Sequence, residues 1–146
     1  MTGKVTVIII LGFSFCFGAL FFYFQTFAYY REVSGLKFIT VNTKKIEVWN
    51  YQGINAKTSA LKMRSCFNTN VSAFQTLVLA EKPQPLTAPF WFSCFNSKDL
   101  QNAIDVGNAR AYLAVENEVE GIDRFVVIYP DGRGYEWRQL NKKYLD

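Results

Sequence analysis

The sequence predicts an α+β protein in which a single N-terminal transmembrane helix precedes a small, mainly antiparallel β domain with one short helix. Three observations lead to this fold class. Residues 5–30 carry no charged side chain, several later segments have the composition and alternation of strands, and one later segment has the apolar spacing of a helix. We divide the chain into an anchor over residues 1–31, a linker over 32–37 and a domain over 38–146.

The run Val5–Tyr30 is long enough to cross a membrane, because about 20 helical residues span the roughly 30 Å hydrocarbon core of a bilayer. A cleaved signal peptide and a buried helix of a soluble protein are the alternatives. The apolar run is longer than a signal-peptide core and no Ala-x-Ala cleavage site follows it, and core helices of such length rarely lack charges. Tyr29, Tyr30 and Arg31 are residue types that settle at headgroup level. We therefore favour an uncleaved anchor in the lipid bilayer.

The domain reads mainly as strands separated by turns. We expect strands over residues 38–41, 46–51, 61–67, 74–80, 109–115, 124–129 and 135–140. The segment 61–67 alternates strictly, with Lys62 and Arg64 on one side, which predicts a strand with one solvent-exposed face. Residues 81–89 hold three of the four prolines and are therefore expected to form a connection rather than a central strand.

One helix of about ten residues is expected after this connection. Ser97 offers an N-cap, a stripe containing Leu100 and Ala103 offers an apolar face, and Gly107 offers a C-cap. Farther on, residues 116–123 read as an acidic turn. Residues 130–134 read as the turn of a hairpin between the last two strands.

Two cysteines of the domain, Cys66 and Cys94, predict a disulfide, as expected for a small exported domain. Such a bond would close a loop of 28 positions and stabilise the fold by about 3.5 kcal/mol in the chain-entropy model. Two buried free thiols in a cytosolic domain are the alternative. The positive-inside rule favours a cytoplasmic domain, because Arg31 and Lys37 outweigh Lys4, but long domains translocate largely regardless of charge. We expect an inner-membrane protein with a cytoplasmic N-terminus and a periplasmic domain.

The chain contains no histidine. Serine or cysteine catalysis assisted by histidine, a histidine-bearing zinc site and a phosphohistidine are thereby excluded. We expect no enzyme activity, no metal and no cofactor, although a pair of catalytic carboxylates stays open. The net charge of +4 lacks the dense basic run typical of nucleic-acid binding, and we expect no nucleic acid partner.

The turn Asp131, Gly132, Arg133 and Gly134 is a candidate ligand or partner loop, since glycine-rich turns can present backbone N–H groups to an anion. The alternative is a plain hairpin turn, for which Asp-Gly is a common pair. The acidic residues Glu116, Glu118, Glu120 and Asp123 have oxygen ligands suited to calcium but do not match the spacing of an EF-hand loop, and a solvated turn is favoured.

Two stretches carry a resemblance to a known family: PLTAPFWFSCF at residues 85–95, and residues 121–137 with the motif PDGRGY at 130–135. Together with the anchor and Cys66, they resemble an uncharacterised family of bacterial, alphaproteobacterial-type, single-pass membrane proteins. Some members carry an automatic histidine kinase label. The resemblance implies the membrane topology and no activity, and the kinase label fits badly because the chain has no histidine to phosphorylate.

These features favour a non-catalytic, membrane-anchored accessory or interaction protein, with the lipid bilayer and another membrane or envelope protein as partners. A periplasmic ligand-sensing or binding domain is the first alternative. A hydrolase using aspartate or glutamate is the second, and it requires two carboxylates that converge in a cleft.

Overall fold

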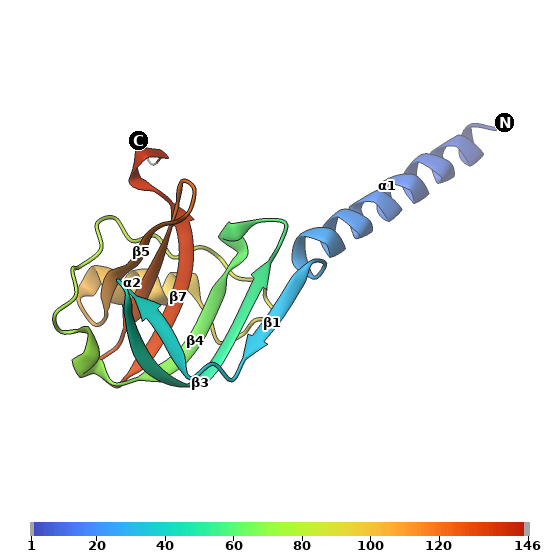
Figure 1. The fold of residues 1–146 in the computed structure, drawn as a ribbon. Helices are drawn as coiled ribbons and strands as arrows, with labels where there is room; N and C mark the ends of the chain where they lie inside the picture. The colour runs from blue at the N-terminus through green and yellow to red at the C-terminus, as the bar shows by residue number, and fades with distance from the viewer. Residues whose placement is uncertain (1, 145–146) are drawn as a thin grey trace.

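The computed structural model describes residues 2–144 and shows a long N-terminal helix that projects from a curved β domain (Figure 1). Helix α1 (Gly3–Thr26) has no buried residue. In the described part of the chain it is the one helix long and apolar enough to cross a membrane. The N-terminal apolar helix, the antiparallel sheet and one short helix confirm the predicted α+β fold class.

Seven strands form one antiparallel sheet of order β1-β3-β4-β7-β6-β5, with β2 also paired to β3. They are β1 (Tyr30–Ser34), β2 (Phe38–Val41), β3 (Lys44–Ala56), β4 (Arg64–Thr69), β5 (Arg110–Val119), β6 (Ile122–Ile128) and β7 (Arg133–Leu140). The other elements are the helix α2 (Ser97–Val106) and the short 3₁₀ helices η1 (Ala60–Lys62), η2 (Val71–Phe74) and η3 (Lys142–Tyr144).

The sheet curls because β3 is long and irregular at its centre. Its C-terminal half pairs with β1, its N-terminal half pairs with β2, and its register to β4 shifts between Trp49 and Gln52. Asn50, inside that shift, has a left-handed φ of 54°, and such bulges bend and twist a strand. The tip of the β2–β3 hairpin reaches β5, where the Asn42 N–H donates to the Ala114 carbonyl at 2.8 Å. The inner face of the sheet is therefore partly enclosed.

Each face of the sheet carries its own apolar core. The inner core is formed by Ile39, Val41, Ile46, Val48, Tyr51, Phe67, Phe74, Tyr112, Ala114, Val126 and Ile128. The outer core is formed by Ile54, Cys66, Phe92, Phe95, Leu100, Ala103, Ala109, Ala111, Phe125, Val127 and Trp137. Helix α2 and the connection before it cover the outer face, so the central strands are buried on both sides.

The strand predicted over residues 61–67 is wrong in its start and in its exposed face. Residues up to Lys62 form η1, and β4 begins at Arg64 in the middle of the sheet. Both faces of β4 are covered, and Arg64 is only 5% exposed. The side chains of β4 do alternate between two faces of the sheet, as predicted, but the face predicted to be exposed to water packs against the outer core.

Two further segment predictions are corrected. Residues 74–80 do not form a strand: η2 ends at Phe74, and only an isolated bridge joins Leu79 to Tyr112. The segment predicted as a linker, 32–37, begins inside β1, where Glu32 lies opposite Ile54. The β domain therefore starts at Tyr30, almost directly after α1.

Helix α2 lies where it was expected, with one change at its cap. Asn96, and not Ser97, is the N-cap, and its side chain accepts from the N–H groups of Lys98 and Asp99. Gly107 is confirmed as the C-cap, with a left-handed φ of 83°.

The hairpin predicted with its turn at residues 130–134 is confirmed, whereas the solvated acidic turn predicted over residues 116–123 is wrong. The acidic segment 116–123 is mostly strand, since β5 runs to Val119 and β6 starts at Ile122. Its Asp123 is buried and accepts hydrogen bonds from the Asn117 N–H and the Asn141 side chain. The turn after β6 closes with a bond from the Gly132 N–H to the Tyr129 carbonyl.

We predict that Gly132→Ala destabilises the protein more than Gly107→Ala does. Both glycines have left-handed φ values, 95° and 83°, so both substitutions cost about 1–2 kcal/mol of backbone strain. A Cβ at Gly132 would also lie 2.7 Å from the Thr69 carbonyl oxygen, whereas one at Gly107 meets no atom within 4 Å. Urea unfolding in detergent should give a further loss of about 1–3 kcal/mol for Gly132→Ala; equal losses would contradict the close packing of this turn against β4.

Candidate functional site

The most unusual part of the domain is the connection over residues 75–96, which contains no strand or helix and crosses the outer face of the sheet. Such a segment cannot satisfy its backbone groups through a ladder of its own, so other groups must hold it. Side chains from β4 and β7 and the end of α1 contact it at four successive places.

The first contact is made by Gln139 of β7, which is 2% exposed. Its side-chain oxygen accepts from the Gln84 N–H at 2.7 Å, and its side-chain nitrogen donates to the Lys82 carbonyl at 3.1 Å. The same oxygen accepts from the indole N–H of Trp137 at 2.9 Å. A single buried amide thus joins the connection to the outer core.

Arg64 of β4 makes the second contact. Its guanidinium donates to the carbonyls of Leu86 and Thr87 at 3.1 and 3.2 Å. It also donates to the carbonyls of Leu61 and Met63, just before its own strand. Burial lowers the pKa of Arg64 to about 10, which still leaves it charged at neutral pH. The buried charge of Arg64 is therefore stabilised by backbone carbonyls of two segments, the connection and the residues just before β4.

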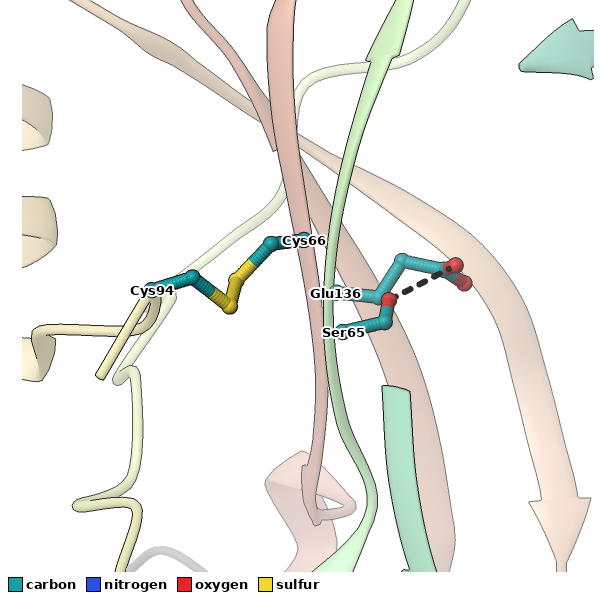
Figure 2. The surroundings of a disulfide bond; sticks show 4 residues. All are labelled: Ser65, Cys66, Cys94 and Glu136. Carbon is teal, nitrogen blue, oxygen red and sulfur yellow. Dashed lines mark hydrogen bonds between the residues drawn. A yellow bond between two sulfur atoms is a disulfide. The ribbon is translucent and has the colours of Figure 1, made fainter. Parts of the chain in front are cut away.

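The third contact is the disulfide between Cys66 and Cys94, which the sequence predicted (Figure 2). The two Cα atoms are 6.3 Å apart, within the usual range for a bridge. Cys66 is buried in the outer core, whereas Cys94 is half-buried. The bond fixes the end of the connection to the central strand just before α2.

The fourth contact joins the connection to the end of helix α1. The indole N–H of Trp91 donates to the carbonyl of Thr26, the last residue of α1, at 2.7 Å. Rings of Phe27, Phe90, Trp91 and Tyr30 pack around this bond, with centroid distances of 5.7 Å for Phe27–Phe90, 6.3 Å for Phe27–Trp91 and 5.4 Å for Tyr30–Trp91. We call Thr26 and these four aromatic residues the aromatic junction. It makes the end of α1 part of the packed structure of the domain.

A hollow of about 310 Å³ lies beside the junction. Its walls are β1 with the middle of β3 on one side and Trp91–Cys94 on the other. The half-buried Cys94 of the disulfide lines this hollow.

A second group of polar side chains, not predicted from the sequence, lies on the inner face of the sheet. Glu136 of β7 is completely buried and accepts a hydrogen bond from the Ser65 hydroxyl at 3.1 Å. Figure 2 shows both residues on the side of the sheet opposite to the disulfide. The guanidinium of Arg124 forms an ion pair with the Glu136 carboxylate.

Arg124 connects this pair to two other strands, β5 and β2. It donates to both oxygens of Glu118 at 3.1 Å and to the Thr40 carbonyl of β2 at 2.7 Å. Glu118 in turn accepts from Arg138 at 3.0 Å. Within residues 2–144, every buried side-chain nitrogen and oxygen has a hydrogen-bond partner. We call Glu118, Arg124, Glu136 and Arg138 the charge cluster.

Burial and neighbouring charges shift the pKa values of Glu136, Arg124 and the nearby Tyr51. Burial raises the pKa of Glu136 above its usual value, although the attraction of Arg124 acts in the opposite direction. Burial acts to lower the pKa of Arg124, but the carboxylates of Glu136 and Glu118 outweigh it and the net shift is upward. Burial, together with the Glu136 charge, raises the pKa of Tyr51 to about 12, so this phenol is neutral at physiological pH.

The charge cluster forms one wall of a second hollow, of about 250 Å³, at the open end of the curled sheet. Leu36 and Phe38, both exposed, also line this hollow. In the cluster, the carboxylates of Glu118 and Glu136 both bind the guanidinium of Arg124. They therefore lie close together, which is the first requirement for a hydrolase with two catalytic carboxylates. Glu136, however, has no exposed surface and both its oxygens accept from protein groups, so the pair is arranged to hold Arg124.

The candidate loop of Asp131, Gly132, Arg133 and Gly134 forms a turn whose groups bind one another. The Asp131 carboxylate accepts from the backbone N–H of Arg133 at 3.1 Å and from its guanidinium at 2.8 Å. The same guanidinium lies 4.3 Å from the ring centroid of Tyr129. The backbone N–H of Arg133 lowers the pKa of Asp131, with a further contribution from its side chain. None of these four residues lines either hollow described above.

The sequence contained a signal for the charge cluster that composition and motifs do not reveal. Arg124, Glu136 and Arg138 interrupt segments that otherwise have strong strand character, and charges inside buried strands occur chiefly as pairs. In the described part of the chain, no three His, Cys, Asp or Glu side chains come together as metal ligands.

A family model, described as a family of unknown function (DUF6446), matches residues 34–145. This range covers nearly the whole β domain and leaves α1 outside it. The comparisons with curated proteins and with solved structures gave no match.

We predict that Glu136→Gln changes how stability depends on pH. A carboxyl whose pKa is raised by folding contributes stability that is present below its unfolded pKa and is lost as pH rises through its folded pKa. The unfolding free energy of the wild type relative to Glu136→Gln should therefore fall as pH increases from about 4.5, the ordinary value. Urea unfolding at a series of pH values measures this difference.

Asp131→Asn serves as the control of opposite sign. The pKa of Asp131 is lowered in the fold, so its contribution is present above the unfolded pKa and disappears as pH falls through the folded one. The effect should be small because this turn is exposed. If the unfolding free energy of the wild type relative to Glu136→Gln instead rose with pH, the attraction of Arg124 would have a larger effect than burial on the pKa of Glu136.

Proposed function

Because the chain belongs to DUF6446, a family of unknown function, its activity must be inferred from its own geometry, and we propose that it is a non-catalytic, membrane-anchored accessory protein. Its domain contacts a membrane complex or another envelope protein. We place it in the bacterial inner membrane, with the N-terminus in the cytoplasm and the domain in the periplasm.

The observation that supports this proposal most is the bond between Trp91 and Thr26. A flexible tether would leave the domain free to rotate, whereas the aromatic junction packs it against the last turn of α1. β1 follows α1 after only a short turn and pairs at once with β3. The domain is thus held at the membrane in a defined orientation, which suits a protein that presents one surface to a neighbour.

The disulfide supports the periplasmic side. Structural disulfides form and persist in oxidising compartments and are rare in the cytosol. The bond between Cys66 and Cys94 attaches the connection to β4, so it is a structural disulfide.

The arrangement of charged groups supports a non-catalytic role. The carboxylates of Glu118 and Glu136 accept from arginine side chains, and the chain has no histidine to serve as a general base. Buried ion pairs of this kind fix how elements meet, and here Arg124 joins β6, β7 and β2.

A surface suited to a protein partner lies at the β5 edge of the sheet, away from α1 (Figure 1). Val78 and Leu79, 71% and 57% exposed, border a small hollow there with Leu113 and Phe125. Exposed apolar side chains beside a strand edge are typical of docking surfaces.

The alternative is a ligand-binding domain, which the hollow beside the charge cluster favours. Its lining offers the charged Glu118 and Arg138 and the apolar Leu36 and Phe38. This combination of a few polar groups with apolar walls is common in sites for small molecules.

We predict that a membrane-impermeant maleimide, added outside intact cells, labels Cys66 and Cys94 only after a reductant. The experiment uses the Cys16→Ser variant, because Cys16 is a free cysteine of α1. Labelling without reductant would contradict the disulfide in cells, and labelling only after the cytoplasm is opened would place the domain on the other side.

We predict that a photoreactive amino acid at position 78 forms adducts with another membrane or envelope protein in living cells. The matched control is position 49, because Trp49 is also an exposed large side chain but lies in β3, near the opposite edge. Position 49 should give no adduct with the same protein. Equal yields at both positions, or adducts only with lipid, would refute the docking surface; a small molecule that co-purifies instead would favour the ligand-binding alternative.

A further inference from the structure

We propose that the domain also rests directly on the bilayer, with the ring of Phe90 and the rim of the aromatic junction inserted among the headgroups on its own side of the membrane. This contact goes beyond the anchor helix, and it does not depend on a protein partner or on which side of the membrane the domain lies.

The depth of the junction follows from the length of α1. A helix of 24 residues rises about 36 Å, slightly more than the roughly 30 Å hydrocarbon core. The last turn, which ends at Thr26, therefore emerges at headgroup level. Trp91 donates to the Thr26 carbonyl and Phe90 packs on Phe27, so the connection lies at that same level.

Phe90 is held in place, because the residues around it are attached to the domain. Phe92 and Phe95 are buried in the outer core, and Cys94 is bonded to Cys66. On the other side, Leu86 and Thr87 bind Arg64. Phe90 nevertheless remains 72% exposed. The domain thus displays an aromatic ring on a constrained loop and cannot withdraw it without breaking these contacts.

The chemistry around Phe90 matches the interface of a bilayer. Phe27 and Tyr29, on the adjoining turn, are also exposed, and aromatic rings prefer the headgroup region. Arg31 follows them with its side chain exposed, and the ammonium of Lys62 lies 5.2 Å from the Tyr30 ring. Basic side chains at this level can reach lipid phosphates. Covering a large apolar side chain is favourable by about 1.5–3 kcal/mol, so exposed rings placed at the bilayer would be drawn into it.

The test is quenching of tryptophan fluorescence by lipids brominated on their acyl chains. The full chain carrying Phe90→Trp is reconstituted in phosphatidylcholine and phosphatidylglycerol vesicles, with and without bromine. The new tryptophan should raise the quenched fraction of the total emission above that of the wild type, whose own tryptophans are Trp49, Trp91 and Trp137.

Val78→Trp is the matched control, because Val78 is 71% exposed but lies at the far edge of the sheet. Its tryptophan should lower the quenched fraction and be quenched instead by iodide in the water. Both variants replace an exposed apolar residue, and formation of the Cys66–Cys94 bond verifies their fold. A quenched fraction for Phe90→Trp that is equal to or below that of the wild type would overturn the proposal. The vesicles contain no other protein, so bromine quenching there also excludes a protein as the cover of Phe90.

Discussion

The structure depends on how a long irregular connection is held against a sheet. Residues 75–96 contain no strand, and three of the side chains that position them come from the two central strands. Gln139 binds its first part, Arg64 its middle and Cys66 its end. A connection held only by apolar contacts would slide, because such contacts have no direction. Hydrogen bonds and a covalent bond select one position, and that position brings Trp91 to the end of α1.

The same central strands also organise the inner face. In β4, Arg64 and Cys66 serve the connection, while Ser65 points to the buried Glu136 across the strand pair (Figure 2). Glu136 then fixes Arg124, whose third partner is the β2 carbonyl of Thr40. The charged Arg124 therefore connects β2 to the central strands, so polar contacts as well as apolar packing hold the sheet in its curled shape. Removing one member of such a buried ion pair leaves the other charge buried without a partner, which lowers the free energy of unfolding by about 3–5 kcal/mol. These polar residues therefore specify the arrangement of the β-strands.

The sequence predicts those features of this molecule that depend on neighbours along the chain. The charge-free run identifies α1, Gly107 ends α2, and Asp131-Gly132 turns the last hairpin, because each signal is local. The disulfide was also predicted, since only two cysteines lie outside α1. What failed depends on distant contacts. The alternation around Arg64 correctly gave two faces, but no local signal tells whether water or a second core covers one of them. The partners of Arg124 come from three separate segments, β2, β5 and β7.

Trp91 shows why the boundary between anchor and domain was also misplaced. A tryptophan in an aromatic run is most often a core residue, and Trp137 is one, with no exposed surface. Trp91 instead uses its N–H on a carbonyl that the helix end leaves without an intrahelical donor. Without α1 and its C-cap Phe27, that N–H and one face of Trp91 would lose their partners, and the domain would expose an apolar surface there. Helix α1 is thus a component of the domain's packing, and its end is positioned by the same contacts that hold the connection.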